Sequence, residues 1–182
     1  MTRSSRIFWG AAISVVLLDQ VTKLLAEANL MRHIPHRVIG DYVRFTLAYN
    51  PGAAFSMSLG AYSRYIFGAF AIVALIILWR IQRTTAAGER LKPLALGLAW
   101  GGAAGNLVDR FRSPMGVVDF LDIGVGSVRF WTFNVADSAV TVGAVVLGWM
   151  LLQEEREEKR RAASGARTAA PAPPPVSGPT RD

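Results

Sequence analysis

The sequence predicts an α-helical integral membrane protein with four transmembrane helices and a small extracytoplasmic β element. Hydrophobic residues make up 52% of the 182 residues, and the mean hydropathy is +0.31. Charged residues account for 18% of the chain and occur in blocks. A bilayer-spanning helix needs roughly 20 apolar residues, and the connecting loops carry the charge. This segregation therefore favours membrane spans over the core of a water-soluble domain.

Four apolar stretches are the predicted spans: residues 7–26, 62–79, 94–108 and 133–152. The second and third are short, and residues 91–93 lead into the third. The first follows two arginines, as the apolar region of a signal peptide would, but no A-x-A-like cleavage site comes after it. We therefore expect an uncleaved first span.

The distribution of lysine and arginine predicts the orientation of the chain. These residues concentrate before the first span, between the second and third, and after the fourth: Arg3, Arg6, Arg80, Arg83, Arg90, Lys92, Arg156, Lys159, Arg160 and Arg161. Since cytoplasmic loops hold the excess of such residues, we expect both termini in the cytoplasm and the first and third loops outside. Topology thus accounts for the net charge of +7, which gives no support to a nucleic-acid partner.

The β element is predicted in the two outer loops, at about 38–58 and 115–131. Alternating apolar residues indicate a strand over 43–49, and Asn50-Pro51-Gly52 is typical of a turn. The third loop, which is the second of the two outer loops, holds candidate strands at 117–123 and 127–131. A peptide could pair with such an element by strand addition.

The predicted membrane domain covers residues 1–152, and a cytoplasmic tail covers 153–182. Glu155 and Lys159, like Glu157 and Arg161, are four residues apart, which predicts a solvated extension of the last helix. From Ser164 onward Ala, Pro, Gly and Ser dominate, a composition that is typical of disorder.

Thiol and metal chemistry are not expected. The chain has no cysteine and only two histidines, His33 and His36, which flank a proline in the first outer loop. A thiolate site is excluded, and neither a zinc site nor a Ser-His-Asp triad is easily assembled from these two positions. We expect no metal and no cofactor.

Ionisable residues near the ends of the spans need an explanation, because they are costly in a membrane and indicate a function or an internal partner. Asp19 and Lys23 have helical spacing near the outer end of the first span and can form an ion pair. Alternatively, Lys23 could be the general base for Ser56 or Ser58, as in a Ser-Lys peptidase.

The third span ends in small residues, which suit close helix packing in lipid, followed by Asn106, Asp109 and Arg110 on one helical face. Asp109 and Arg110 could form a salt bridge at the membrane interface, or they could belong to a functional site. In the first outer loop, Gly52 suits a tight turn, and the amide of Asn50 could hold a peptide backbone.

Two aspartates are candidates for catalysis. Asp119 lies in an apolar extended segment, and Asp137 lies at the start of the fourth span, where the helix dipole also favours an acidic residue. Asp122 is expected to be less embedded. Two close carboxylates share a proton, so that one can deprotonate a water molecule while the other polarises a scissile carbonyl. The pair therefore predicts acid–base hydrolysis of a peptide.

Five motifs resemble, in order and spacing over about residues 7 to 152, the lipoprotein signal peptidases (signal peptidase II) of bacteria. They are Asp19-Gln20-Val21-Thr22-Lys23, Asn50-Pro51-Gly52-Ala53-Ala54-Phe55, residues 101–110, Val117-Val118-Asp119-Phe120 and Phe133-Asn134-Val135-Ala136-Asp137. Residues 130–132 lack the proline that many members carry there. The resemblance implies an aspartic endopeptidase of the bacterial cytoplasmic membrane, without a metal. It would remove the signal peptide from prolipoproteins just before a diacylglyceryl-modified cysteine.

The resemblance also implies roles for the matching residues. Asp119 and Asp137 would be the catalytic pair. The other matching residues would line or support the substrate site: Asn50, Gly52, Asn106, Arg110, Asn134, Asp19, Lys23 and Asp109. Besides prolipoproteins, we expect contact with membrane lipids and a monomeric state.

Two other functional classes stay open at this point. A small transporter or proton relay would also use intramembrane carboxylates, although the ionisable residues here gather at one membrane face instead of tracing a path across. A structural role would account for the small residues and the β element. It would not explain the paired aspartates or the asparagines.

Overall fold

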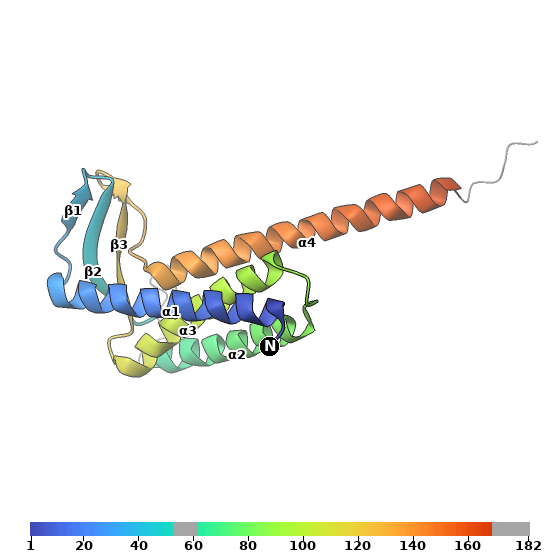
Figure 1. The fold of residues 1–182 in the computed structure, drawn as a ribbon. Helices are drawn as coiled ribbons and strands as arrows, with labels where there is room; N and C mark the ends of the chain where they lie inside the picture. Colours follow the sequence, from blue (N-terminus) through green and yellow to red (C-terminus); the bar gives the residue numbers. More distant parts are fainter. Residues whose placement is uncertain (53–61, 169–182) are drawn as a thin grey trace, which may run out of the picture. The chain divides into compact units, whose positions relative to one another are not determined.

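The computed structural model describes residues 1–52 and 62–168, and the chain divides into two compact units, Met1–Leu147 and Gly148–Asp182. The predicted four helices are confirmed (Figure 1): α1 Arg3–Asn29, α2 Ser63–Thr84, α3 Leu91–Arg112 and α4 Val135–Thr168. Each begins before or ends beyond the apolar stretch that predicted it, because polar residues at the membrane surface continue the helical hydrogen bonding.

Three of the described helices are long and apolar enough to cross a membrane: Arg3–Asn29, Ser63–Thr84 and Val135–Arg161. Only 11% of the apolar window in α2 is buried, so side chains such as Phe70 and Val73 face outward. Large apolar surfaces of this kind are stable against lipid rather than water. The chain is a multi-pass membrane protein.

Helix α3 is less apolar than the others because glycine and alanine occupy its packing surfaces. A Cβ atom added at Gly97 or Gly101 would lie 2.5 Å or 2.7 Å from backbone oxygens of α1, and one added at Gly143 of α4 would lie 2.7 Å from the carbonyl oxygen of Ala95 in α3. The backbones of α1 and α4 therefore approach α3 at distances that only glycine permits. The prediction of close helix packing around these small residues is confirmed.

The β element is an antiparallel sheet of four strands, in the order β1-β2-β3-β4: β1 His36–Ile39, β2 Val43–Asn50, β3 Val117–Val125 and β4 Val128–Arg129. The strand predicted over 43–49 is confirmed, and β3 extends two residues beyond its predicted end. Strand β4 is shorter than predicted because the chain leaves it towards α4, with Phe133 forming a separate bridge to Leu121. Figure 1 shows the sheet beside the C-terminal end of α1.

Polar contacts attach the sheet to the helices at this end. The hydroxyl of Tyr49 in β2 donates to Glu27 of α1 at 3.0 Å, and Arg112 of α3 forms an ion pair with Glu27 at 2.7 Å. One carboxylate thus connects three elements close to the residues that line the site.

Helix α4 continues beyond its apolar part into the charged segment. The predicted pairs are present, at 2.5 Å between Lys159 and Glu155 and 3.8 Å between Arg161 and Glu157. Disorder is predicted from Ser164 onward, but residues 164–168 form the end of α4, and residues 169–182 lie outside the described residues.

Candidate active site

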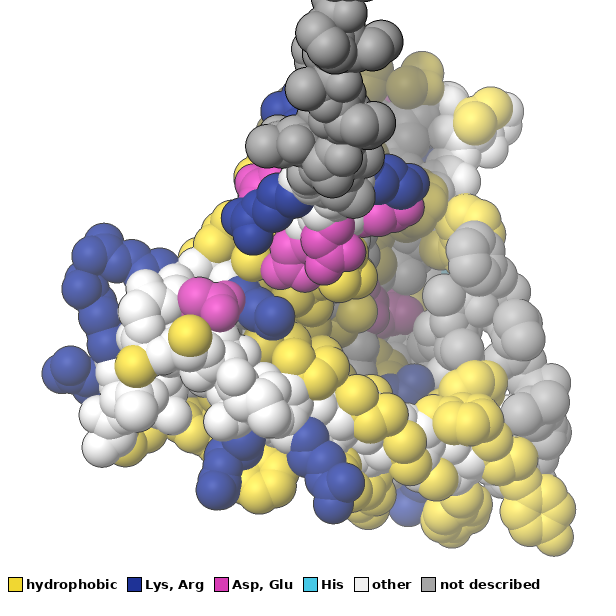
Figure 2. Space-filling model, turned by 90° about the vertical axis from the view of Figure 1, so that its right-hand side faces the viewer, with side chains coloured by type: hydrophobic (Ala, Val, Ile, Leu, Met, Phe, Trp, Pro, Cys, Tyr) yellow, Lys and Arg dark blue, Asp and Glu magenta, His cyan; other side chains and the backbone are white. Residues whose placement is uncertain are grey.

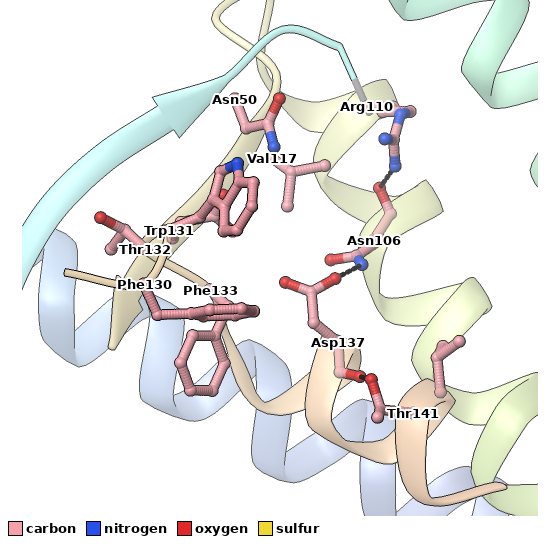
Figure 3. Close-up of a pocket in the computed structure, with 12 residues that line it drawn as sticks. Asn50, Asn106, Arg110, Val117, Phe130, Trp131, Thr132, Phe133, Asp137 and Thr141 are labelled. Carbon is pink, nitrogen blue, oxygen red and sulfur yellow. Dashed lines mark hydrogen bonds between the residues drawn. The ribbon is translucent and has the colours of Figure 1, made fainter. Parts of the chain in front are cut away.

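A cavity of about 410 Å³ lies where α3, α4, β3 and the segment before α4 meet (Figure 3). Its lining includes five of the residues that the sequence nominated: Asn50, Asn106, Arg110, Asp119 and Asp137. Figure 3 shows Asp137 between the asparagine and arginine of α3 on one side and the aromatic side chains of residues 130–133 on the other. The two aspartates thus open into one space.

Asp137 is positioned by the first turn of α4. Its backbone N–H donates to Oδ1 of Asn134 at 2.8 Å, and its Oδ2 accepts from the backbone N–H of Asn134 at 3.1 Å. This reciprocal arrangement is a capping box, which satisfies N–H groups at the start of the helix. Its Oδ1 accepts from Nδ2 of Asn106 at 2.8 Å. Both carboxylate oxygens therefore accept hydrogen bonds, an arrangement that suits an ionised group.

Asp119 reaches the same cavity from β3 and is 4% exposed. Burial raises its pKa to about 7, and the negative charge of Asp137 contributes to this rise, against hydrogen bonds from Asn134 and Asn50 that favour the ionised form. The surroundings thus distinguish the two acids. Asp119 keeps a proton near neutral pH, whereas Asp137 is surrounded by donors.

The side chain of Asn134 connects the two aspartates. Its Nδ2 donates to Oδ1 of Asp119 at 2.8 Å and to the carbonyl oxygen of Val118 at 3.2 Å. The Oδ1 atom of the same amide accepts a hydrogen bond from the backbone N–H of Asp137. Asn134 is completely buried, and its side-chain amide and its backbone N–H together hold the two carboxyl groups in a defined relation.

Asn106 links this centre to a buried lysine. Its Oδ1 accepts from Nζ of Lys23 at 2.9 Å and from Nδ2 of Asn134 at 3.1 Å. Two donors on the oxygen fix the orientation of the amide, so its NH₂ group must point to Asp137. Lys23 thereby influences the site without lining the cavity.

The predicted ion pair between Asp19 and Lys23 is confirmed, at 2.7 Å, with both side chains fully buried. Asp109 contacts the same ammonium at 2.8 Å. With Asn106, the three N–H groups of Lys23 have three acceptors. Asp19 also accepts from the backbone N–H of Ala136 at 2.9 Å, which provides a second cap for α4.

The interpretation of Asp109 with Arg110 as a salt bridge is wrong. Adjacent helical residues point in different directions, so Asp109 faces α1 while Arg110 lines the cavity. Arg110 donates to the carbonyl oxygens of Asn106 and Gly52 at 3.0 Å and 2.9 Å. It thereby holds the turn in which Oδ1 of Asn50 accepts from the N–H of Gly52 at 3.0 Å.

Asp122 is less buried than Asp119, as expected, but it too is buried. It is 8% exposed, and its Oδ1 accepts from Nε of Arg129 at 2.5 Å while its Oδ2 accepts from Thr46 at 3.2 Å. Strand pairing brings these partners together from β2 and β4, which local spacing does not reveal.

Sequence reasoning did not identify the aromatic wall of the cavity, formed by Phe130, Trp131 and Phe133. The available signal was the cluster of aromatic residues between the last strand and the fourth span. Ser56 and Ser58, the candidate nucleophiles of the Ser-Lys alternative, lie outside the described residues. Within the described residues, no group of three or more His, Cys, Asp or Glu side chains could hold a metal ion.

Comparisons with known proteins agree with this architecture. A family model described as Signal peptidase (SPase) II matches residues 11–153. A "Lipoprotein signal peptidase" of Desulforapulum autotrophicum is 44% identical over 136 residues, which cover 72% of this chain and 83% of the relative. A protein of the same name from Cupriavidus taiwanensis is 42% identical over 145 residues, which cover 78% and 80%.

Two solved structures described as bacterial membrane enzymes are also similar to this chain. Their TM-scores are 0.72 and 0.69, with sequence identities of 31% and 32%. The matches cover 80% and 78% of this chain, and 87% and 90% of the solved chains. Because the family model spans most of the chain and the relatives share its sequence and fold, this protein belongs to the signal peptidase II family.

Proposed function

We propose that this chain is a membrane aspartic endopeptidase with Asp119 and Asp137 as its catalytic pair. Its substrates are prolipoproteins, from which it removes the signal peptide just before a diacylglyceryl-modified cysteine. The relatives' name, lipoprotein signal peptidase, supports the substrate class. The observation that carries the catalytic assignment is the bridging of the two aspartates by one buried amide, that of Asn134, at the wall of a single cavity.

The different surroundings of the two acids suggest how they divide the work. Asp137 accepts a proton from a water molecule, whose oxygen attacks the scissile carbonyl carbon. Asp119, protonated because of its raised pKa, donates a hydrogen bond to the carbonyl oxygen, on which negative charge develops. The C–N bond then breaks, and the proton held by Asp137 passes to the departing amine of the lipidated cysteine.

The neighbouring residues position this pair. Asn106 and Asn134 orient the carboxyl groups, and Arg110 holds the turn containing Asn50 and Gly52 against α3. Further from the cavity, Asp19, Lys23 and Asp109 supply the buried charges that fix Asn106 and the start of α4. All of these residues come from one chain, and we propose that the enzyme acts as a monomer.

We further infer that both termini are cytoplasmic and that the site lies at the extracytoplasmic face of the bacterial inner membrane. Figure 2 views the molecule from the right-hand side of Figure 1 and shows Lys and Arg side chains, together with some Asp and Glu side chains, on this face. Arg3 and Arg6 near the start of α1 and Arg83 near the end of α2 are exposed. An excess of positive residues is typical of the cytoplasmic side. A prolipoprotein could then keep its lipid tails in the bilayer while its peptide reaches the aspartates.

Cleavage of a synthetic diacylglyceryl-modified prolipoprotein peptide by the purified protein in detergent tests this proposal. We expect Asp119→Asn and Asp137→Asn each to lower kcat by at least about a thousandfold, since either change removes one half of the acid–base pair. Ser56→Ala and Asp41→Asn, matched controls outside the proposed centre, should cleave like the wild type. Cleavage at the wild-type rate by either aspartate variant would refute the catalytic pair.

The Ser-Lys alternative is weaker because Lys23 is fully buried between two carboxylates and Asn106. All three of its N–H groups have acceptors, and its side chain does not line the cavity, so the contacts it makes are structural. Loss of cleavage in Ser56→Ala would nevertheless favour that mechanism. A transporter would instead show a flux in liposomes that disappears in Asp137→Asn.

A further inference from the structure

A second cavity, of about 480 Å³, adjoins the one that holds the aspartate pair. The two cavities share Asn50, Asp119 and residues 130–132 in their linings. Beyond these shared residues they differ in chemistry. The first is continued by Val140 and Thr141 of α4, whereas the second is lined by the end of β2 and by the charged side chains of Asp122 and Arg129.

A peptide that crosses the aspartate pair must therefore run from one cavity into the other. Val140 and Thr141 follow Asp137 by about one helical turn, so the first cavity extends along α4 towards the membrane interior. A signal peptide is apolar and enters from the membrane. The second cavity lies over the sheet, on the side where the chain released from the membrane must leave.

Resting on the proposed function, we infer that the second cavity binds the substrate residues that follow the lipidated cysteine, and that the Asp122–Arg129 pair sets which charges are accepted there. Asp122 lies three residues beyond Asp119 on β3, which is about 10 Å along a strand. An extended substrate covers this distance in about three residues. Counting the cysteine beside Asp119 as the first residue, the third and fourth residues therefore reach the pair.

The contacts of this pair make it electrically balanced. Arg129 donates to the carboxylate of Asp122 at 2.5 Å, to the carbonyl oxygen of Asp122 at 3.0 Å and to that of Asp41 at 2.8 Å. The two side chains remain 17% and 11% exposed, so their surfaces still contribute to the cavity wall. With equal and opposite charges at the same place, the wild-type cavity favours neither sign of substrate charge. The proposed effect is tolerance of varied mature sequences.

Removal of one partner should convert tolerance into selectivity. Diacylglyceryl-modified peptides that carry Lys, Ser or Glu at both the third and fourth positions are compared by kcat/KM. For the wild type we expect similar values for the Lys and Glu peptides. Arg129→Gln leaves the charge of Asp122 unbalanced and should raise the Lys-to-Glu ratio about tenfold, as expected for a unit charge a few ångströms away in a partly hydrated site. Asp122→Asn should lower the ratio by a similar factor.

Two control variants and the comparison of the three peptides separate this effect from damage to the fold. Arg37→Gln removes an equal charge from an exposed position of β1 and should leave the ratio at its wild-type value. The double variant Asp122→Asn/Arg129→Gln is neutral again and should return the ratio towards that of the wild type. A general loss of folding lowers cleavage of all three peptides together and does not change the ratio.

A Lys-to-Glu ratio that stays at the wild-type value in Asp122→Asn, and in Arg129→Gln if that variant is active, would overturn the assignment of the second cavity. Cleavage of the Ser peptide would in that case still support the proposed function. Failure of the wild type to cleave any of the three peptides would instead refute the proposed function itself.

Discussion

Replacement of Asp119 by asparagine should abolish cleavage and at the same time stabilise the folded protein above neutral pH. The pKa of Asp119 is raised from 3.8 to about 7, mainly by burial. Between these two values the folded state holds a proton that the unfolded state has released, so the stability of the wild type falls as the pH rises. The amide in the Asp119→Asn variant does not titrate, so the variant would avoid this loss.

The magnitude follows from the two pKa values. At about 1.4 kcal/mol per pH unit, the cost of Asp119 is about 2 kcal/mol at pH 5 and about 4 kcal/mol at pH 8, where it is nearly complete. The advantage of Asp119→Asn over the wild type should therefore grow by about 2 to 3 kcal/mol between pH 5 and pH 8. Thermal unfolding in detergent micelles at several pH values measures this difference as a change in Tm.

Asp122→Asn provides the matched control. It makes the same change on the same strand, but the carboxylate that it removes forms an ion pair with Arg129. It leaves the guanidinium of Arg129 without its ion pair and should destabilise the protein by about 3 kcal/mol. A stability difference between Asp119→Asn and the wild type that is equal at pH 5 and pH 8 would refute the assignment of a raised pKa to Asp119.

Three further predictions concern the pH profile, the buried charges and the helix packing. kcat/KM should fall as the pH rises through about 7, because Asp119 must be protonated to donate to the carbonyl oxygen, and a kcat/KM that is constant from about pH 6 to pH 9 would exclude this role. Lys23→Met should lower the free energy of unfolding by about 3–5 kcal/mol, because two buried carboxylates lose their cation, and a Tm at or above that of the wild type would contradict this account. Gly101→Val should lower the Tm in detergent, whereas Gly10→Val, at an open position on α1, should not, and equal effects of the two would argue against the close approach of α1 and α3.

The spans and strands could be predicted because their signals are local. Apolar stretches of about 15 to 20 residues identified the four helices, and the alternation of apolar and polar residues identified β2. Boundaries were less accurate: β4 is shorter than expected because Phe133 pairs with Leu121 instead of continuing that strand. Such competition between partners depends on where the next helix begins, which local sequence does not specify.

Part of the candidate site could also be predicted. Paired ionisable residues near the ends of spans are unusual enough to indicate a site, and five of the nominated residues line one cavity. Helical spacing correctly predicted the contact of Asp19 with Lys23. The prediction for Asp109 was wrong, because this carboxylate contacts Lys23 of α1 and not Arg110, its neighbour in sequence.

The sequence by itself determined that this is a membrane protein, which residues are its candidate acids, and which family motifs it carries. Only the tertiary structure decided how these acids differ and what holds them. Lys23 contacts Asn106 across 83 positions of the chain, and Asp19 caps α4 across 117 positions. The burial of Asp119, its contact with Asn134 and the pairing of Asp122 with Arg129 likewise depend on the packing of separate elements. Hydrogen-bond geometry and desolvation are properties of that packing, and no local pattern of residue types specifies them.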